Sequence, residues 1–282
     1  MAYSSGNLIL DDHYNSFASD TNDVWGTGSG DYGYGQANTV SSVSAGSTIT
    51  ATQWATLLSR IASAASHQGS SITTISGPSA GNTISAYTAL SGNITAIRSN
   101  RQNYAANGTD ITSGGSKSYT SSWIGSVTAT YTITFGSADQ IRLFDNCGGT
   151  IRVDFARSGG TTTNKNSEWT DTCNKAGPVS INPYGLSGSY AQKSKTYADS
   201  SPYTANYIKT SAYKSGSIVY IKVEYVDAAP DARGSFGEDA WMDIVNGTLT
   251  TTAVVRPPSS TYITSTWGSQ SIVGSVTGTN AY

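Results

Sequence analysis

Two stretches of the chain place apolar residues at the three- and four-residue steps of an α-helix. The first covers residues 48–67. Near its start, Thr50-Ala51-Thr52-Gln53 fits a capping box, in which the Gln53 side chain reaches back to the backbone of Thr50. The second run extends from Tyr87 to Tyr104 and predicts a helix of about 20 residues. Both apolar stripes are narrow, so we expect this helical hairpin, residues 48–107, to dock on another part of the chain or on another subunit.

After residue 108 the apolar residues recur with period two, the pattern of half-buried strands. Residues 126–135 and 217–225 show it most clearly. Repeated short strands with turns between them predict an antiparallel β-sandwich over residues 108–258. Two of the strands, at 140–144 and 150–156, flank the turn Asn146-Cys147-Gly148-Gly149 and are expected to form a hairpin. The other expected strands lie at 187–198, 203–213 and 243–256.

The two ends of the chain show little periodicity. Residues 1–47 are expected to form an extended N-terminal arm with turns. Residues 259–282 are rich in Ser, Thr and Gly, and form either a loose C-terminal arm or an added strand. The predicted fold is therefore mainly β with a small α part: an N-terminal extended arm and a helical hairpin, followed by an antiparallel β-sandwich.

A glycine-rich stretch inside the arm, VWGTGSGDYGYGQ at residues 24–36, contains a literal G-x-G-x-x-G. This motif marks a dinucleotide site only when it follows a strand and opens a helix. Neither flank has such a pattern here, so we interpret the glycines as allowing tight backbone turns. We expect a fixed loop whose aromatic residues pack on a neighbouring surface. The expected assembly contacts are Trp25, Tyr32 and Tyr34 from this loop and Trp54 from the first predicted helix.

Composition narrows the functional classes. Charged residues make up 12% and hydrophobic residues 37% of the 282 residues, and the net charge is -2. Such a polar, weakly charged chain is typical of extracellular fibres, adhesins and capsid-type proteins. The balance of charge provides no basic patch for nucleic acid and no attraction to a membrane surface. The sequence has no apolar run long enough for a membrane helix and no signal-peptide pattern at its start.

Residues that could carry catalysis or bind a metal are few. The chain has two histidines. Asp11-Asp12-His13 groups possible metal ligands, but without a second motif it is interpreted as a solvated loop. His67 is expected to cap the end of the first helix. We therefore expect no enzyme, no cofactor and no metal.

Two alternatives remain open in the segment ARGSFGEDAW. Phe236 and Trp241 are candidate glycan contacts, since aromatic rings stack on sugars, so the chain is alternatively a carbohydrate-binding adhesin. Glu238 and Asp239 are a candidate carboxylate pair for a glycan-degrading enzyme.

The two cysteines, Cys147 and Cys173, are expected to remain unpaired. They lie 26 positions apart, and nothing in the strand pattern requires their Cα atoms to approach within the roughly 7 Å that a disulfide needs. We interpret them as small apolar core residues of a protein that folds in a reducing cytoplasm.

Two stretches resemble segments of structural proteins in the virions of tailed bacteriophages, especially phages of cyanobacteria and other aquatic bacteria. The first is VWGTGSGDYGYGQ together with the helix start ITATQW and the following HQG. The second is TYTITFGSADQIRLFDNCGGTIRVDFARSGG with KNSEWTD, and it departs from the resembled pattern at Asp145 and Cys147. In that pattern, Arg142 to Phe144 lie on a strand. The resemblance covers roughly residues 20–175, with weaker similarity to residue 256.

This resemblance implies a non-enzymatic structural subunit of a phage tail, neck or fibre. Its partners would be other copies of itself and other virion proteins, with host surface polysaccharide as an alternative partner. Such a subunit assembles in the host cytoplasm through its N-terminal part, displays the β-sandwich, and leaves the cell by lysis.

Overall fold

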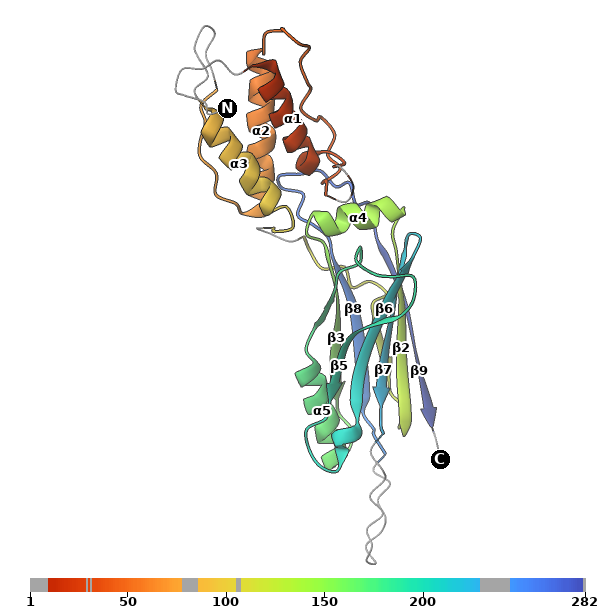
Figure 1. Cartoon of the computed structure of the whole chain (residues 1–282). Helices are drawn as coiled ribbons and strands as arrows, with labels where there is room; N and C mark the ends of the chain where they lie inside the picture. The colour runs from red at the N-terminus through yellow and green to blue at the C-terminus, as the bar shows by residue number, and fades with distance from the viewer. Residues whose placement is uncertain are drawn as a thin grey trace, which may run out of the picture. The chain divides into compact units, whose positions relative to one another are not determined.

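The computed structural model describes residues 10–28, 30, 32–77, 86–104, 108–228 and 244–280 (Figure 1). The chain divides into two compact units. The helical unit comprises Met1–Gly108, Arg142–Gly149 and Pro257–Trp267, and the sandwich unit comprises the remainder. This grouping differs from the four consecutive segments expected from the sequence, because short pieces from the middle and end of the chain join the helices. The expected fold class, mainly β with a small α part, is confirmed.

Three helices, α1 (Asp11–Trp25), α2 (Ala51–Gln68) and α3 (Tyr87–Ser99), pack pairwise in the helical unit (Figure 1). The predicted capping box at the start of α2 is confirmed. The Gln53 backbone N–H donates to Thr50 Oγ1 at 3.2 Å, and the Thr50 N–H donates to Gln53 Oε1 at 2.9 Å. Gly69 ends α2 in the left-handed region, with φ of 68°. α3 is shorter than expected and stops well before Tyr104.

The prediction of an extended arm over residues 1–47 is wrong for α1. Its buried face consists of Tyr14, Phe17, Ala18, Thr21, Val24 and Trp25, which follow helical spacing. Because this face includes an alanine and a threonine, its large apolar residues are too sparse to show the period. Asp11 and Asp12 lie in the first turn of the helix, where negative charge is favoured, and not in a solvated loop.

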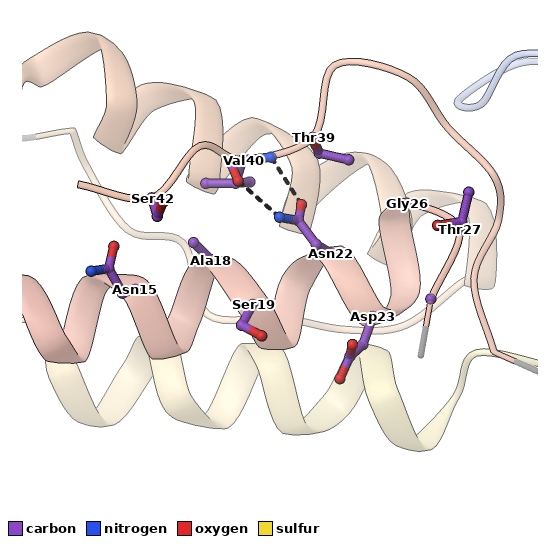
Figure 2. A pocket seen from close by; sticks show the side chains of 11 residues that line it. Asn15, Ala18, Ser19, Asn22, Asp23, Gly26, Thr27, Thr39, Val40 and Ser42 are labelled. Carbon is purple, nitrogen blue, oxygen red and sulfur yellow. Dashed lines mark hydrogen bonds between the residues drawn. The ribbon is translucent and has the colours of Figure 1, made fainter. Parts of the chain in front are cut away.

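Side-chain amides tie extended segments of the helical unit to its helices. Asn22 on α1 accepts from the Val40 N–H at 2.9 Å and donates to the Val40 carbonyl at 2.8 Å (Figure 2). Asn15 makes the same pair of bonds with Val43, and Asn93 makes it with Thr73. Each side-chain amide thus pairs with both backbone groups of one extended residue, as a neighbouring strand would. Each bond contributes about 1 kcal/mol net to holding the extended segments on the helices.

The described strands of the sandwich unit form two antiparallel sheets. One has the order β1-β8-β3-β4 and the other β5-β6-β7-β2-β9. Their bounds are β1 (Ser116–Tyr119), β2 (Gly125–Thr134), β3 (Thr150–Ser158), β4 (Val179–Ile181), β5 (Ala191–Tyr197), β6 (Tyr207–Ser215), β7 (Ile218–Val226), β8 (Thr248–Arg256) and β9 (Ser271–Asn280). The strands expected at 126–135 and 217–225 are β2 and β7, and the C-terminal segment supplies β9 as an added strand.

The core between the sheets follows the period-two pattern. On β7, Val219, Ile221, Val223 and Tyr225 are buried, while their neighbours along the strand are only partly buried. Two buried tyrosines satisfy their hydroxyls on the opposite sheet. Tyr131 donates to the Thr251 carbonyl at 2.7 Å, and the Tyr225 hydroxyl lies 2.6 Å from Thr251 Oγ1. Because their hydroxyls are hydrogen-bonded, these buried tyrosines join the two sheets without the free-energy cost of an unpaired buried polar group.

The strand expected at 140–144, and with it the hairpin before residue 150, is wrong: α4 (Ala138–Asn146) is a helix. Four consecutive residues, Ile141, Arg142, Leu143 and Phe144, are buried, so neither periodicity is visible in the sequence. The sequence does carry a start signal for this helix, since Ser137 Oγ accepts from the Gln140 N–H at 3.1 Å in an S-x-x-Q pattern.

A further helix, α5 (Asn164–Ala176), lies in the sandwich unit and packs on β3 (Figure 1). Thr163 caps its start by accepting from the Asn166 N–H at 3.2 Å. Its buried face includes Lys165, Asn166, Glu168 and Thr172 beside Trp169 and Cys173. A stripe that is mostly polar escapes a search for apolar periodicity, which explains why the sequence did not predict this helix.

Candidate assembly surface

Three of the four aromatic residues expected to contact a neighbouring subunit are buried within the helical unit. Trp54 and Tyr34 are 0% exposed and Trp25 is 5% exposed. The Tyr34 hydroxyl donates to the Arg101 carbonyl at 2.7 Å and accepts from Gln68 at 2.8 Å. The expectation is corrected for these three, because a side chain without exposed surface offers no contact to a second subunit. They form the core of the helical unit.

Tyr32 differs from these three because it is 46% exposed. The Arg101 guanidinium lies 3.9 Å from the centroid of its ring. This cation–π contact fixes one side of the ring and leaves the rest accessible. A role for Tyr32 in assembly remains a prediction.

The glycine-rich loop follows α1 and not a strand, which removes the context that a dinucleotide site needs. The loop requires glycine at two positions for steric and conformational reasons. A Cβ on Gly33 would lie 2.2 Å from the Gly26 carbonyl oxygen and 2.3 Å from the Gly28 nitrogen. Gly28 itself has φ of 77°. The backbone of Gly33 therefore contacts the backbone of residues 26–28. This close approach agrees with the interpretation of the loop as a set of tight turns.

His67 does not cap the end of α2, as its position in the sequence suggested. Its Nε2–H donates to the Cys147 carbonyl at 2.9 Å, and its ring lies edge-on to Tyr34. Since a carbonyl only accepts, the bond fixes the tautomer that carries the proton on Nε2. Burial lowers the pKa of His67, and the bond to Cys147 opposes this shift more weakly.

This environment predicts a pH dependence of stability. A folded-state pKa below the unfolded value of 6.5 means that the unfolded chain binds the extra proton first as the pH falls. The helical unit should therefore lose stability as the pH drops below 6.5, and His67→Gln should flatten this slope. Urea denaturation at several pH values measures it, with His13→Gln as the control. Equal slopes for wild type and His67→Gln would contradict the assignment.

The remaining candidates from the sequence separate into two groups. Asp11, Asp12 and His13 belong to α1, and among the described residues no three His, Cys, Asp or Glu side chains are grouped to hold a metal. Phe236, Glu238, Asp239 and Trp241 lie outside the described residues.

Both cysteines are free and buried, as expected. Burial raises the pKa of the Cys173 thiol to about 12 and raises that of Cys147 as well. Neither is therefore a reactive thiolate near neutral pH. In the part of the chain that the structure describes, no helix combines the length and apolar character needed to cross a bilayer.

The outer face of the five-stranded sheet divides into two regions. Over β2 and β9 it carries hydroxyls paired across the strands: Ser126 with Thr279 at 3.0 Å, and Thr130 with Ser275 at 2.9 Å. Over β5, β6 and β7 it carries tyrosines and charged side chains. Lys209 and Lys222 both contact Glu224, at 2.8 and 3.1 Å.

The tyrosines on this face contact one another and lysine ammonium groups. Tyr213 stacks on Tyr220 with ring centroids 4.4 Å apart and planes at 7°, and Tyr190 meets Tyr213 edge-on at 4.6 Å. Lys195 lies 3.9 Å from the centroid of the Tyr207 ring. These contacts occupy ring faces that a sugar would need for stacking. The tyrosines in these contacts therefore do not strengthen the glycan-binding alternative.

The four sheet edges differ in how far they are protected against pairing with another strand. β1 and β4 are short, with 4 and 3 residues. β5 has a bulge between Gln192 and Ser194 and carries Lys193 and Lys195. Short strands, bulges and lysines are the usual devices that discourage pairing with a further strand.

The β9 edge lacks all of these devices. It runs for 10 residues, SIVGSVTGTN, without a charge or a proline. It pairs with β2 in unbroken register from Ser271 to Asn280, and within the described part of the chain no strand pairs with its other side. Val273 on the outer face is 65% exposed. A long, regular, uncharged edge is a template for strand addition, which makes β9 the candidate assembly surface.

Sequence reasoning left β9 undecided for an identifiable reason. The positions of β9 that face the core include Gly274 and Gly278, whose missing side chains make room for Tyr131 and Tyr119. Glycine at core positions erases the apolar alternation. The alternating Ser, Val and Thr at odd positions from 271 to 279 were the remaining signal of a strand.

No family model matches the chain, and the searches of curated proteins and of solved structures also returned no match.

Proposed function

We propose that this chain is a non-enzymatic structural subunit of a tailed-phage virion and that its copies pair through the β9 edge. The open edge of β9 is the observation that carries the proposal, because every second residue along its 10-residue length directs its backbone N–H and C=O away from β2, where a further strand could pair. The resemblance of residues 20–175 to virion proteins supplies the setting. In the helical unit, Tyr32 is the one exposed residue among the four aromatic contacts expected from the sequence.

The partner that fits this edge best is a second copy of β9. An antiparallel pair around a two-fold axis at Ser275 or Val276 places odd-numbered residues opposite odd-numbered residues, so hydroxyls face hydroxyls except where Val273 faces a threonine. The fold already contains such pairs, including Ser118 with Thr250 at 3.0 Å. The pairing would continue the sheet across the two subunits and cover Val273. An uncharged strand meets its own copy without electrostatic repulsion.

Charge complementation tests this pairing. Ser275→Lys and Ser275→Asp are each expected to weaken self-association, because like charges would meet across the axis. An equimolar mixture of the two variants should restore a dimer of mixed composition. Light scattering coupled to size-exclusion chromatography measures the molar mass, and native mass spectrometry measures the composition.

Thr130→Lys is the matched control, since Thr130 lies opposite Ser275 on the same face but one strand further from the edge. It should leave association unchanged. A wild-type protein that stays monomeric at every concentration tested would overturn the pairing. Absence of the chain from purified virions of its source, by peptide mass spectrometry, would overturn the virion setting independently.

A further inference from the structure

An ion pair is buried in the sandwich unit at the junction of α5 and the end of β7. Lys165 Nζ lies 2.6 Å from Asp227 Oδ2, and the two side chains are 2% and 1% exposed. Lys165 is in the first turn of α5, and Asp227 directly follows β7. Side chains this deeply buried are unusual for both residue types, which are almost always solvated.

A backbone hydrogen bond fixes Asp227, and aromatic side chains pack against one another next to Lys165. The Asp227 N–H donates to the Gly125 carbonyl at 2.7 Å. Trp169, one helical turn after Lys165, packs on Trp123 with ring centroids 4.9 Å apart and on Tyr225 at 6.3 Å. The amine and the carboxyl group are thus held together next to an apolar cluster.

Condensation of an amine with a carboxyl group requires the uncharged forms of the two groups. A buried ion pair loses the hydration of both charges, and transfer of one proton from ammonium to carboxylate removes both charges. The resulting amine and carboxylic acid are the forms that condense. A fixed contact of this kind also replaces a bimolecular encounter with an intramolecular one.

We propose that Lys165 and Asp227 form an intramolecular isopeptide bond. The Nζ lone pair attacks Cγ of the protonated carboxyl group, and a C–N bond forms. The C–O bond to the hydroxyl breaks, and the hydroxyl leaves with a proton from the nitrogen as one water molecule. No oxidation or reduction takes place, and no co-reactant is consumed. The product is a neutral amide, which remains buried at lower cost than two charges.

The intact mass of the denatured full-length protein tests the bond. It should be lower than the mass calculated from the sequence by one water molecule, and proteolysis should yield one branched peptide that joins residues 165 and 227. Lys165→Arg keeps the positive charge and removes the nucleophile, so its mass should match its sequence. The control Lys175→Arg alters an exposed lysine of the same helix and should retain the deficit.

The branched peptide distinguishes the isopeptide from loss of water at a single aspartate, which joins no two segments. It also makes the test independent of whether Lys165→Arg folds. A wild-type protein of full mass, with residues 165 and 227 recovered in separate peptides, would overturn the proposal.

Discussion

Replacing Trp54 with alanine is expected to lower the free energy of unfolding of the helical unit by about 3–5 kcal/mol, the usual cost of truncating a fully buried aromatic side chain. Trp54 has no exposed surface and lies near the start of α2, on the face that packs inside the unit. Its loss leaves a cavity that the neighbouring helices fill only in part. Urea denaturation followed by the helical circular-dichroism signal measures the change.

Tyr32→Ser is the matched comparison, because Tyr32 is the exposed member of the same group of four aromatic residues. It should change stability by about 1 kcal/mol or less, the value of a cation–π contact at an exposed site. A Trp54→Ala protein that keeps wild-type stability but no longer assembles would contradict the placement of Trp54 in the core.

Gly33→Ala should be the second strongly destabilising change, with a loss of about 3 kcal/mol or more, because rigid backbone atoms block the added methyl group. The nearest of them, from residues Gly26, Thr27 and Gly28, lie at 2.2–2.3 Å. No rotation of a side chain relieves contacts with backbone. The loop would have to open, and with it the hydrogen bond from Asn146 to the Gly33 carbonyl at 3.0 Å.

Gly30→Ala provides the control within the same motif. Gly30 has φ of 68° but nothing within 4 Å of the added Cβ, so the cost should be about 1 kcal/mol from the left-handed backbone alone. Thermal melting of the wild type and the two variants compares the loss of stability that a methyl group causes at each glycine. Equal effects of Gly30→Ala and Gly33→Ala would contradict the steric account of the loop.

Elements with strong local patterns were predicted correctly. The α2 helix combines a capping box with an apolar stripe, and β2 and β7 alternate over most of their length. In these segments, local preference and tertiary packing agree, so the sequence alone is sufficient.

The failures occur where the buried residues are polar or small. The buried face of α5 includes Lys165, Asn166 and Glu168, and their partners come from distant parts of the chain, as for Glu168, which accepts from the Asp199 N–H at 2.7 Å. A periodicity search counts such residues as exposed. The start signals at Ser137 and Thr163 were present but stood outside any visible apolar period.

The candidate surface was beyond sequence reasoning for a different reason. An edge is defined by the absence of a neighbouring strand, which depends on the order of strands in the sheet. The aromatic residues chosen as contacts followed the general enrichment of Trp and Tyr at interfaces, but the same residues also fill cores. Burial separated the two roles, with Tyr34 inside and Tyr32 outside.

The most direct measurement of pairing through β9 is residue-resolved hydrogen–deuterium exchange at high and low protein concentration. In a single subunit, the β9 amides that point away from β2 have no strand partner and should exchange rapidly. On association they should become protected, while the outward amides of the bulged β5 edge keep exchanging at one rate. Exchange of the β9 amides that is identical at both concentrations would contradict pairing through this edge.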